Sequence, residues 1–296
     1  MAVSRFRPVD WLVSGYAAIV VVTAASRLPG NPSLVWVMLG HALIPALAWA
    51  LSTTPVSRSE GGRVLRELYP LFLLIGLYSA LDPLARAAGM AVHDATVQRW
   101  ELALFGMQPS RLLWQAFPSP LLSSVLHAAY LAYYGIVAVP PVVLACQRKW
   151  QHVQWYVFNV LLTFVVCYVV FLFFPVAGPY YEFERPAAWF LDNGPARAVY
   201  AVLAGGSSYG AAFPSSHVAA TLVSTAAAWR ASRPMGAVLA APAALLTMAV
   251  VYCQMHYAVD ALAGIAVAAG CLWIGARVMR SSASGDAGVP AGSRSL

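Results

Sequence analysis

Charged residues are scarce in this sequence. Only 10% of its 296 residues are Asp, Glu, Lys or Arg, whereas 60% are hydrophobic. A soluble domain carries about a quarter charged residues, and a single globular core cannot hide so large an apolar excess. The composition therefore excludes an ordinary soluble protein and favours one that crosses the lipid bilayer.

Lysine is almost absent, since Lys149 is its one occurrence. The net charge of +7 comes from arginines that stand singly or in pairs between apolar runs. A nucleic-acid-binding protein would gather them on one face, so we expect no nucleic-acid partner. With the N-terminus in the cytoplasm, twice as many basic residues lie on the cytoplasmic side as on the other, as membrane proteins prefer.

Cysteine and clustered carboxylates are also sparse. The four cysteines are widely spaced and form no CxxC or zinc pattern, so we interpret them as small packing residues. The carboxylates do not cluster as magnesium ligands would. We therefore expect neither a metal nor another cofactor.

Long apolar runs are the main feature that is present, and they predict an all-α polytopic membrane protein of about eight transmembrane helices. The runs cover roughly 11–27, 34–52, 68–88, 120–146, 154–174, 213–230, 236–254 and 257–279. We expect N-terminal transmembrane spans in residues 1–65, a membrane catalytic domain with a C-terminal helical-bundle core in residues 66–280, and a disordered tail in residues 281–296. The arginine and alanine bias favours a bacterial cell membrane.

The two long connections, 89–119 and 175–212, fall on the extracytoplasmic side in this topology. The segment His93–Phe105 reads as an amphipathic helix lying in the membrane interface, with Asp94, Gln98 and Glu101 on its polar face. Near the start of a later span stand His127, Tyr130, Tyr133 and Tyr134. Two interpretations of these rings stay open: an aromatic belt at the membrane surface, or the lining of a headgroup pocket.

Phe213–His217 (FPSSH) opens an apolar helix, because Pro-Ser-Ser is typical of a helix N-terminus. Such a terminus offers free backbone N–H groups and the positive end of the helix dipole, which together bind phosphate. The hydroxyls of Ser215 and Ser216 add donors to this site. His217 stands in the first turn, where it can reach the same anion.

A second polar stretch, His256–Asp260 (HYAVD), begins the last span. His256 and Asp260 are four residues apart, so on a helix they share one face. A carboxylate there can accept the imidazole N–H and make the other ring nitrogen more nucleophilic. An ionisable residue at the start of a span otherwise free of charge is a functional candidate.

One predicted span separates the two stretches, so both histidines lie at the extracytoplasmic ends of their helices. The loop before His217 holds Arg185, a candidate phosphate ligand. Such a set suits phosphoryl transfer by covalent catalysis. His256 would attack phosphorus, Asp260 would orient it and His217 would protonate the leaving oxygen.

The pattern PSSH, followed on the next helix but one by HYxxD, resembles the type 2 phosphatidic acid phosphatase superfamily. The resemblance covers roughly residues 65–280. It implies a helical membrane fold, lipid-phosphate chemistry through a phosphohistidine intermediate, and the roles of nucleophile, orienting carboxylate and general acid for His256, Asp260 and His217.

Two positions depart from the pattern of that superfamily. Its first motif carries a lysine seven residues before Arg-Pro, and here Gly178 precedes Arg185-Pro186. It also has an arginine six residues before the nucleophile, where this chain has Val250. The departures are similar to those of the inositol phosphorylceramide synthases and their bacterial relatives, which implies a headgroup transferase.

The residues therefore predict a metal-independent phosphatase or phosphotransferase that acts on a lipid phosphate or a phospholipid headgroup within the bilayer. They do not distinguish water from a lipid hydroxyl as the final acceptor. A membrane transporter is the alternative of another class, but it would carry polar residues at mid-membrane in several spans. A catalytically inactive scaffold leaves the His-Asp spacing unexplained.

Overall fold

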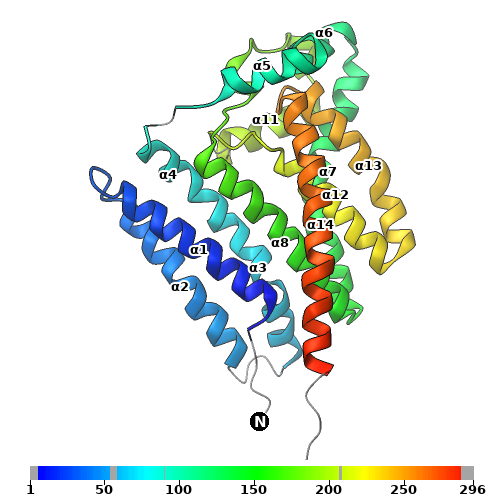
Figure 1. The fold of residues 1–296 in the computed structure, drawn as a ribbon. Coiled ribbons are helices and arrows are strands. Elements are labelled where there is room, and N and C mark those ends of the chain that lie inside the picture. Colours follow the sequence, from blue (N-terminus) through cyan, green and yellow to red (C-terminus); the bar gives the residue numbers. More distant parts are fainter. Residues whose placement is uncertain (1–5, 54–58, 90, 207–208, 288–296) are drawn as a thin grey trace, which may run out of the picture.

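The structure is a computed structural model that describes residues 6–53, 59–89, 91–206 and 209–287. Within these ranges it contains fourteen α-helices and no β-strand (Figure 1). Seven of the helices are long and apolar enough to cross a membrane. The prediction of an all-α polytopic membrane protein is therefore confirmed.

The N-terminal half of the membrane region consists of four helices beside one later helix. α1 and α2 form an antiparallel pair, α3 continues into the short α4, and both α1 and α3 pack against α8 (Figure 1). Their bounds are α1 Pro8–Arg27, α2 Leu34–Thr53, α3 Glu60–Ser79, α4 Leu81–Ala87 and α8 Trp150–Phe173.

The C-terminal bundle has α12 in its interior, packed against α7, α8, α13 and α14. The bounds are α7 Pro120–Cys146, α12 Ser216–Ala231, α13 Arg233–Tyr252 and α14 Ala258–Ala287. Small side chains on α12 let its neighbours approach closely, as is usual between helices in membranes. α14 continues through Ala287, and residues 288–296 of the expected tail lie outside the described residues.

α12 corresponds to the expected sixth span, and it is not among the seven candidate spans. Its 16 residues reach only about 24 Å at 1.5 Å per residue, less than the hydrocarbon thickness of about 30 Å. The predicted span began at residue 213, but residues 213–215 form a turn ahead of the helix. α12 begins where its N-cap residue Ser215 is hydrogen-bonded to Asp260 in the first turn of α14.

Five short helices cover the end of the bundle at which α12 and α14 begin. These are α5 Asp94–Phe105, α6 Pro109–Ala116, α9 Pro179–Glu182, α10 Ala188–Leu191 and α11 Gly194–Gly206. In Figure 1 α5, α6 and α11 lie at the end opposite the N-terminus. A β-bridge between Val176 and Ala211 ties two of the connecting loops together beneath them.

Serine hydroxyls define where several long helices begin. The side chain of Ser119 accepts a hydrogen bond from the backbone N–H of Leu122 at the start of α7, and Ser232 caps α13 in the same way. Each such cap satisfies one of the N–H groups that a helix terminus leaves without a partner.

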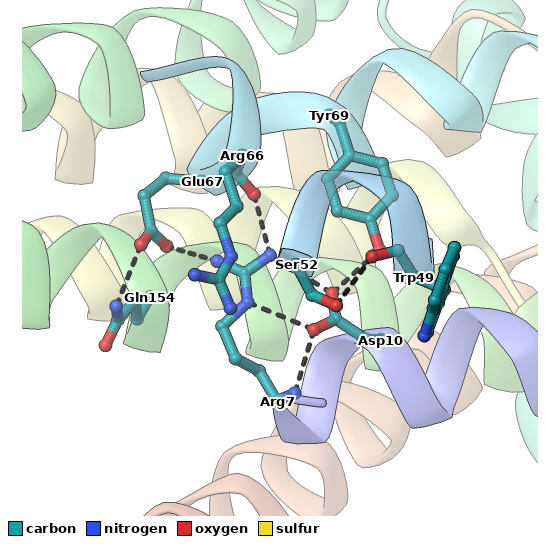
Figure 2. Close-up of polar contacts among 8 residues, drawn as sticks. All are labelled: Arg7, Asp10, Trp49, Ser52, Arg66, Glu67, Tyr69 and Gln154. Atoms are coloured by element: carbon teal, nitrogen blue, oxygen red, sulfur yellow. Dashed lines mark hydrogen bonds and ion pairs between the residues drawn. The ribbon is translucent and has the colours of Figure 1, made fainter. Parts of the chain in front are cut away.

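The opposite end of the molecule is held by a buried polar cluster that joins α1, α3 and α8 (Figure 2). The guanidinium of Arg7 lies 2.6 Å from Glu67 and 3.1 Å from Asp10. The hydroxyl of Tyr69 donates to Asp10 at 2.8 Å, and the Gln154 amide donates to Glu67 at 2.9 Å. Because each carboxylate has several donors, the charges are compensated where they are buried.

Candidate active site

The N-terminus of α12 presents the first of the two predicted motifs. Ser215 is its N-cap, and its hydroxyl accepts from the backbone N–H of Val218 at 3.3 Å. Its own backbone N–H donates to the carbonyl of Asp260 at 3.0 Å. Ser216 is the first helical residue and is buried, and His217 follows it. The motif therefore begins a helix, as predicted, and it is bonded directly to the second motif.

A tight turn between α13 and α14 positions His256. The carbonyl of Val250 accepts from the backbone N–H groups of both Met255 and His256, and Gln254 adopts the left-handed conformation with φ 58°. The carboxylate of Asp260 accepts from the backbone N–H of Tyr257 at 2.8 Å. The turn brings the His256 ring to the start of α12, where it is 3% exposed.

The two histidines meet as the topology predicted. Nε2 of His256 lies 3.3 Å from Nδ1 of His217. Nδ1 of His256 lies 2.9 Å from the carbonyl oxygen of Ala212, and 3.5 Å from the carboxylate of Asp260. Because a carbonyl can only accept, Nδ1 carries the proton and Nε2 carries the lone pair. The imidazole thus directs its unprotonated nitrogen toward His217.

The surroundings of His256 keep its imidazole neutral. Burial disfavours the imidazolium form and lowers the pKa of His256 to about 4. A nucleophile must carry a free lone pair. At neutral pH His256 therefore meets this requirement without giving up a proton first.

Two tyrosines of α7 contact His217. The hydroxyl of Tyr130 lies 3.1 Å from Nε2 of His217, and the ring of Tyr133 lies 4.5 Å from the imidazole, centroid to centroid. Of the two interpretations of the α7 aromatics, the geometry favours the lining of the site for these two rings. Sequence reasoning did not choose between them, because tyrosine at a membrane end is typical of both.

α5 binds the loop where the superfamily pattern has a lysine. The carboxylate of Asp94 accepts from the backbone N–H groups of Ala177 and Gly178 at 2.7 and 2.8 Å. Gly178 has φ 98°, and an added Cβ would lie 3.0 Å from the Cβ of Ala212. A lysine at Gly178 would be strained in this conformation.

α5 also binds the loop that carries His256. The hydroxyl of Tyr257 donates to Asp94 at 3.0 Å, and Gln98 donates to that hydroxyl at 2.9 Å. Glu101 accepts from the backbone N–H of Ala258 at the start of α14, and burial raises the pKa of Glu101 to about 7. α5 therefore joins both loops of the site through its polar face.

The orientation of α5 explains why sequence reasoning missed these roles. Its polar face was expected to meet solvent in the membrane interface, but Asp94 and Glu101 are 2% and 0% exposed. On the apolar face Trp100 and Leu104 are 45% and 60% exposed, whereas Val97 is buried. The available signal was the spacing of Asp94, Gln98 and Glu101, which places three polar groups on one helical face.

The remaining predicted residue, Arg185, lies in the exposed loop between α9 and α10. Its guanidinium stacks over the ring of Tyr180 at 3.8 Å. No contact of the described residues joins it to either histidine. The structure thus brings together His217, His256, Asp260, Ser215 and Ser216, and leaves Arg185 apart. Val250, where the pattern has an arginine, is fully buried in an apolar cluster.

Comparison with known proteins identifies the family of the chain. Neither a curated protein nor a solved structure matches the chain. The family model described as PAP2 superfamily matches residues 95–274, which is more than half of the chain and includes both histidines, Asp260 and α5 from its second residue onward. The chain therefore belongs to the PAP2 superfamily, that of the type 2 phosphatidic acid phosphatases.

Proposed function

We propose that this protein is a membrane phosphatase or phosphotransferase that takes the phosphoryl group from a lipid phosphate or a phospholipid headgroup ester through a phosphohistidine on His256. Membership of the PAP2 superfamily supports an enzyme of the phosphatase type. The observation that carries the proposal is the pairing of His256 Nε2 with His217 Nδ1 at 3.3 Å. Since the imidazole is itself the nucleophile, the chemistry requires no metal ion.

In the first step Nε2 of His256 attacks phosphorus, and the bond from phosphorus to the lipid oxygen breaks. His217 gives its proton to that oxygen, so the lipid leaves as an alcohol. The entering phosphate is anionic, and its charge favours a protonated His217 beside it. The carbonyl of Ala212 and the carboxylate of Asp260 stabilise the positive charge that develops at Nδ1 of His256.

In the second step an acceptor hydroxyl attacks the phosphohistidine. His217, now neutral, takes the proton of that hydroxyl, and the bond from phosphorus to Nε2 breaks to regenerate His256. Water as the acceptor gives a phosphatase, and a lipid hydroxyl gives a phosphotransferase.

The phosphate would be held at the N-terminus of α12. The first intrahelical hydrogen bond runs from the backbone N–H of Ala219 to the carbonyl of Ser215. The backbone N–H groups of Ser216 and His217 precede it and can donate to phosphate. We assign the hydroxyls of Ser215 and Ser216 to the same cradle. Arg185 would join it only by leaving its stacked position over Tyr180.

We place the site on the extracytoplasmic face of a bacterial cell membrane. Support comes from the distribution of arginines and from the arrangement of the helices, since α12 and α14 both begin at the end opposite the N-terminus (Figure 1). The substrate would enter sideways from the bilayer, because both of its parts, lipid tail and headgroup, are then accommodated without leaving the membrane surface.

A headgroup transferase similar to the inositol phosphorylceramide synthases is the second candidate. The residues Gly178 and Val250 favour it, since they stand where the phosphatase pattern has cations. Where the phosphatase pattern has a lysine in this loop, the chain has Gly178, whose backbone N–H donates to Asp94. The two candidates differ only in the acceptor.

The first test measures turnover of purified protein in detergent with EDTA, using lipid phosphates and phospholipids with and without inositol or ceramide-like acceptors. We expect His256→Ala to abolish turnover and phosphoryl labelling of the protein while membrane insertion survives. His217→Ala should reduce turnover by about 100-fold or more with alkoxide leaving groups and less with good ones.

His152→Ala is the matched control, because His152 lies in the first turn of α8 at the opposite end of the bundle. It should keep the wild-type rate. Wild-type rates in His256→Ala would contradict the assignment of the nucleophile. Release of free phosphate without an acceptor identifies a phosphatase, and a new headgroup-bearing lipid formed only with an acceptor identifies a transferase.

A further inference from the structure

A continuous chain of hydrogen bonds crosses the site from α7 to the loop before α12. The hydroxyl of Tyr130 lies 3.1 Å from Nε2 of His217. Nδ1 of His217 lies 3.3 Å from Nε2 of His256, and Nδ1 of His256 lies 2.9 Å from the carbonyl oxygen of Ala212. Every nitrogen of the two imidazoles therefore has a partner in this chain.

The carbonyl of Ala212 fixes the direction of the whole chain. A carbonyl only accepts, so His256 donates from Nδ1 and accepts at Nε2. His217 must then donate from Nδ1 and accept at Nε2. The group facing Nε2 of His217 has to be a donor, and the Tyr130 hydroxyl can supply that proton.

We propose that Tyr130 is a positioning residue for the general acid, an inference that rests on the proposed function. Its hydroxyl holds the His217 ring in the orientation that keeps Nδ1 beside the reacting nitrogen of His256, 3.3 Å from Nε2. When His217 is protonated, Nε2 also carries a hydrogen, and the same hydroxyl turns to accept from it. A phenol serves both states because it is donor and acceptor, whereas a carbonyl or an ammonium group serves one.

The position of Tyr130 in the fold suits this role. Its side chain is 4% exposed, and its ring stacks on the His217 imidazole with centroids 5.0 Å apart and planes inclined by 28°. Tyr130 also packs in the apolar cluster that includes Leu126 and Tyr252. The packing restricts the rotamer of Tyr130, so its hydroxyl stays directed at Nε2.

Tyr133 is the matched control within the same helix. Its ring contacts the same imidazole at 4.5 Å between centroids, but its hydroxyl takes no part in the chain of bonds. Tyr130→Phe and Tyr133→Phe each remove one oxygen from a ring that packs on His217. They differ in whether that oxygen binds the general acid.

The experiment compares wild type, Tyr130→Phe and Tyr133→Phe in detergent with two substrates, a lipid alkyl phosphate and an aryl phosphate. We expect Tyr130→Phe to lower kcat for the alkyl phosphate by about 10- to 100-fold, the worth of a hydrogen bond to a charged group. The loss should be several-fold smaller for the aryl phosphate, whose leaving group needs no proton. For Tyr130→Phe with the alkyl phosphate, the alkaline limb of the pH profile should move to lower pH by about one unit, because the His217 imidazolium has lost its hydrogen-bond acceptor.

Equal losses for both substrates, or equal behaviour of the two variants, would overturn the proposal. If Tyr130→Phe fails to fold, as thermal unfolding of the purified protein will reveal, Tyr130 is replaced by a fluorotyrosine, which keeps the hydroxyl and makes it more acidic. An alkaline limb unmoved by the fluorotyrosine would then overturn it. A wild-type protein that forms no phosphohistidine refutes the proposed function itself, which is a different result from an active wild type insensitive to Tyr130.

Discussion

The acceptor closest to Nδ1 of His256 is a main-chain oxygen. The Ala212 carbonyl lies at 2.9 Å and the Asp260 carboxylate at 3.5 Å. Asp260 also accepts from the backbone N–H of Tyr257, so it holds the turn as well as facing the ring. The orientation of the His256 ring thus depends on the fold of the loop before α12 and on Asp260 together.

The neutral state of His256 predicts the acid side of the pH profile. Its pKa is lowered to about 4 by burial, so kcat/KM, which reports groups of the free enzyme, should fall only as the pH drops through about 4. The free energy of unfolding should also fall as the pH drops. The unfolded chain takes up this proton near pH 6.5, so the contribution of His256 to stability is present above that pH and is lost toward pH 4. Rates measured with an aryl phosphate at decreasing pH check this prediction.

A midpoint near pH 6.5, the ordinary value for histidine, would show that His256 is exposed to water in the free enzyme. His152→Ala again serves as the control, since removing a histidine at the other end of the bundle should leave the midpoint unchanged.

Side-chain identities made part of the site predictable. His217, His256 and Asp260 stand in patterns whose spacing predicts both their helices and their common membrane face, and the structure places them together. The carbonyl of Ala212 has no signature in sequence, because every residue carries one. Tyr130 was visible as a residue, but its contact with His217 depends on how α7 packs beside α12.

Among the helices, α12 and α14 meet at a point that leaves no room for a side chain. A Cβ added to Gly264 of α14 would lie 2.6 Å from the carbonyl oxygen of Ser215. The same two helices are bonded there through Ser215 N–H and the Asp260 carbonyl. Close approach through glycine is a common way for membrane helices to pack, and here it sets the distance between the two motifs.

Gly264→Ala should therefore destabilise the protein by about 1–3 kcal/mol through overpacking and should lower turnover as well, because it separates His217 from His256. Gly270→Ala, on the same helix with open space around the added carbon, should be neutral or slightly stabilising. Thermal unfolding in detergent and turnover of both variants test this. Equal behaviour of the two variants would mean that the helices move apart without cost.

Helices were predictable as elements because long apolar runs carry a strong signal, and six of the expected spans overlap transmembrane candidates closely. The start of α3 was not predictable in this way, because α3 begins well before its apolar run and its first turns carry Glu60, Arg63 and Arg66. The burial of the polar face of α5 could not be predicted from the sequence either. Periodicity shows that two faces differ, but it does not show which one the protein covers.

At the scale of the molecule, the two ends of the bundle have different tasks. The end near the N-terminus holds α1, α3 and α8 together through the cluster around Arg7 and Glu67 (Figure 2). The other end holds the histidines and the short helices. The proposed catalytic domain, residues 66–280, includes the family match over 95–274, and its boundary remains a prediction.

The four cysteines allow the topology to be tested. Cys146 ends α7 and is exposed, whereas Cys167, Cys253 and Cys271 are buried. Cys146 lies at the N-terminal end of the bundle, because the next helix carries Gln154, which bonds to Glu67 in the cluster there. In sealed vesicles a membrane-impermeant maleimide should label Cys146 only where the cytoplasmic face is outside.

Cys146→Ser is the control and should abolish the labelling in either kind of vesicle. Labelling of Cys146 from the extracytoplasmic face would invert the topology and would place both histidines on the cytoplasmic side.

α5 has a further consequence for how this enzyme depends on its surroundings. Its side chains Trp100, Leu102 and Leu104 are exposed, whereas its carboxylates face the two loops of the candidate site, the reverse of a helix on a soluble protein. We infer that lipid covers these exposed side chains and forms the outer layer of the candidate site. When detergent replaces that lipid, the geometry of the histidines is the property at risk, even while every transmembrane helix stays folded.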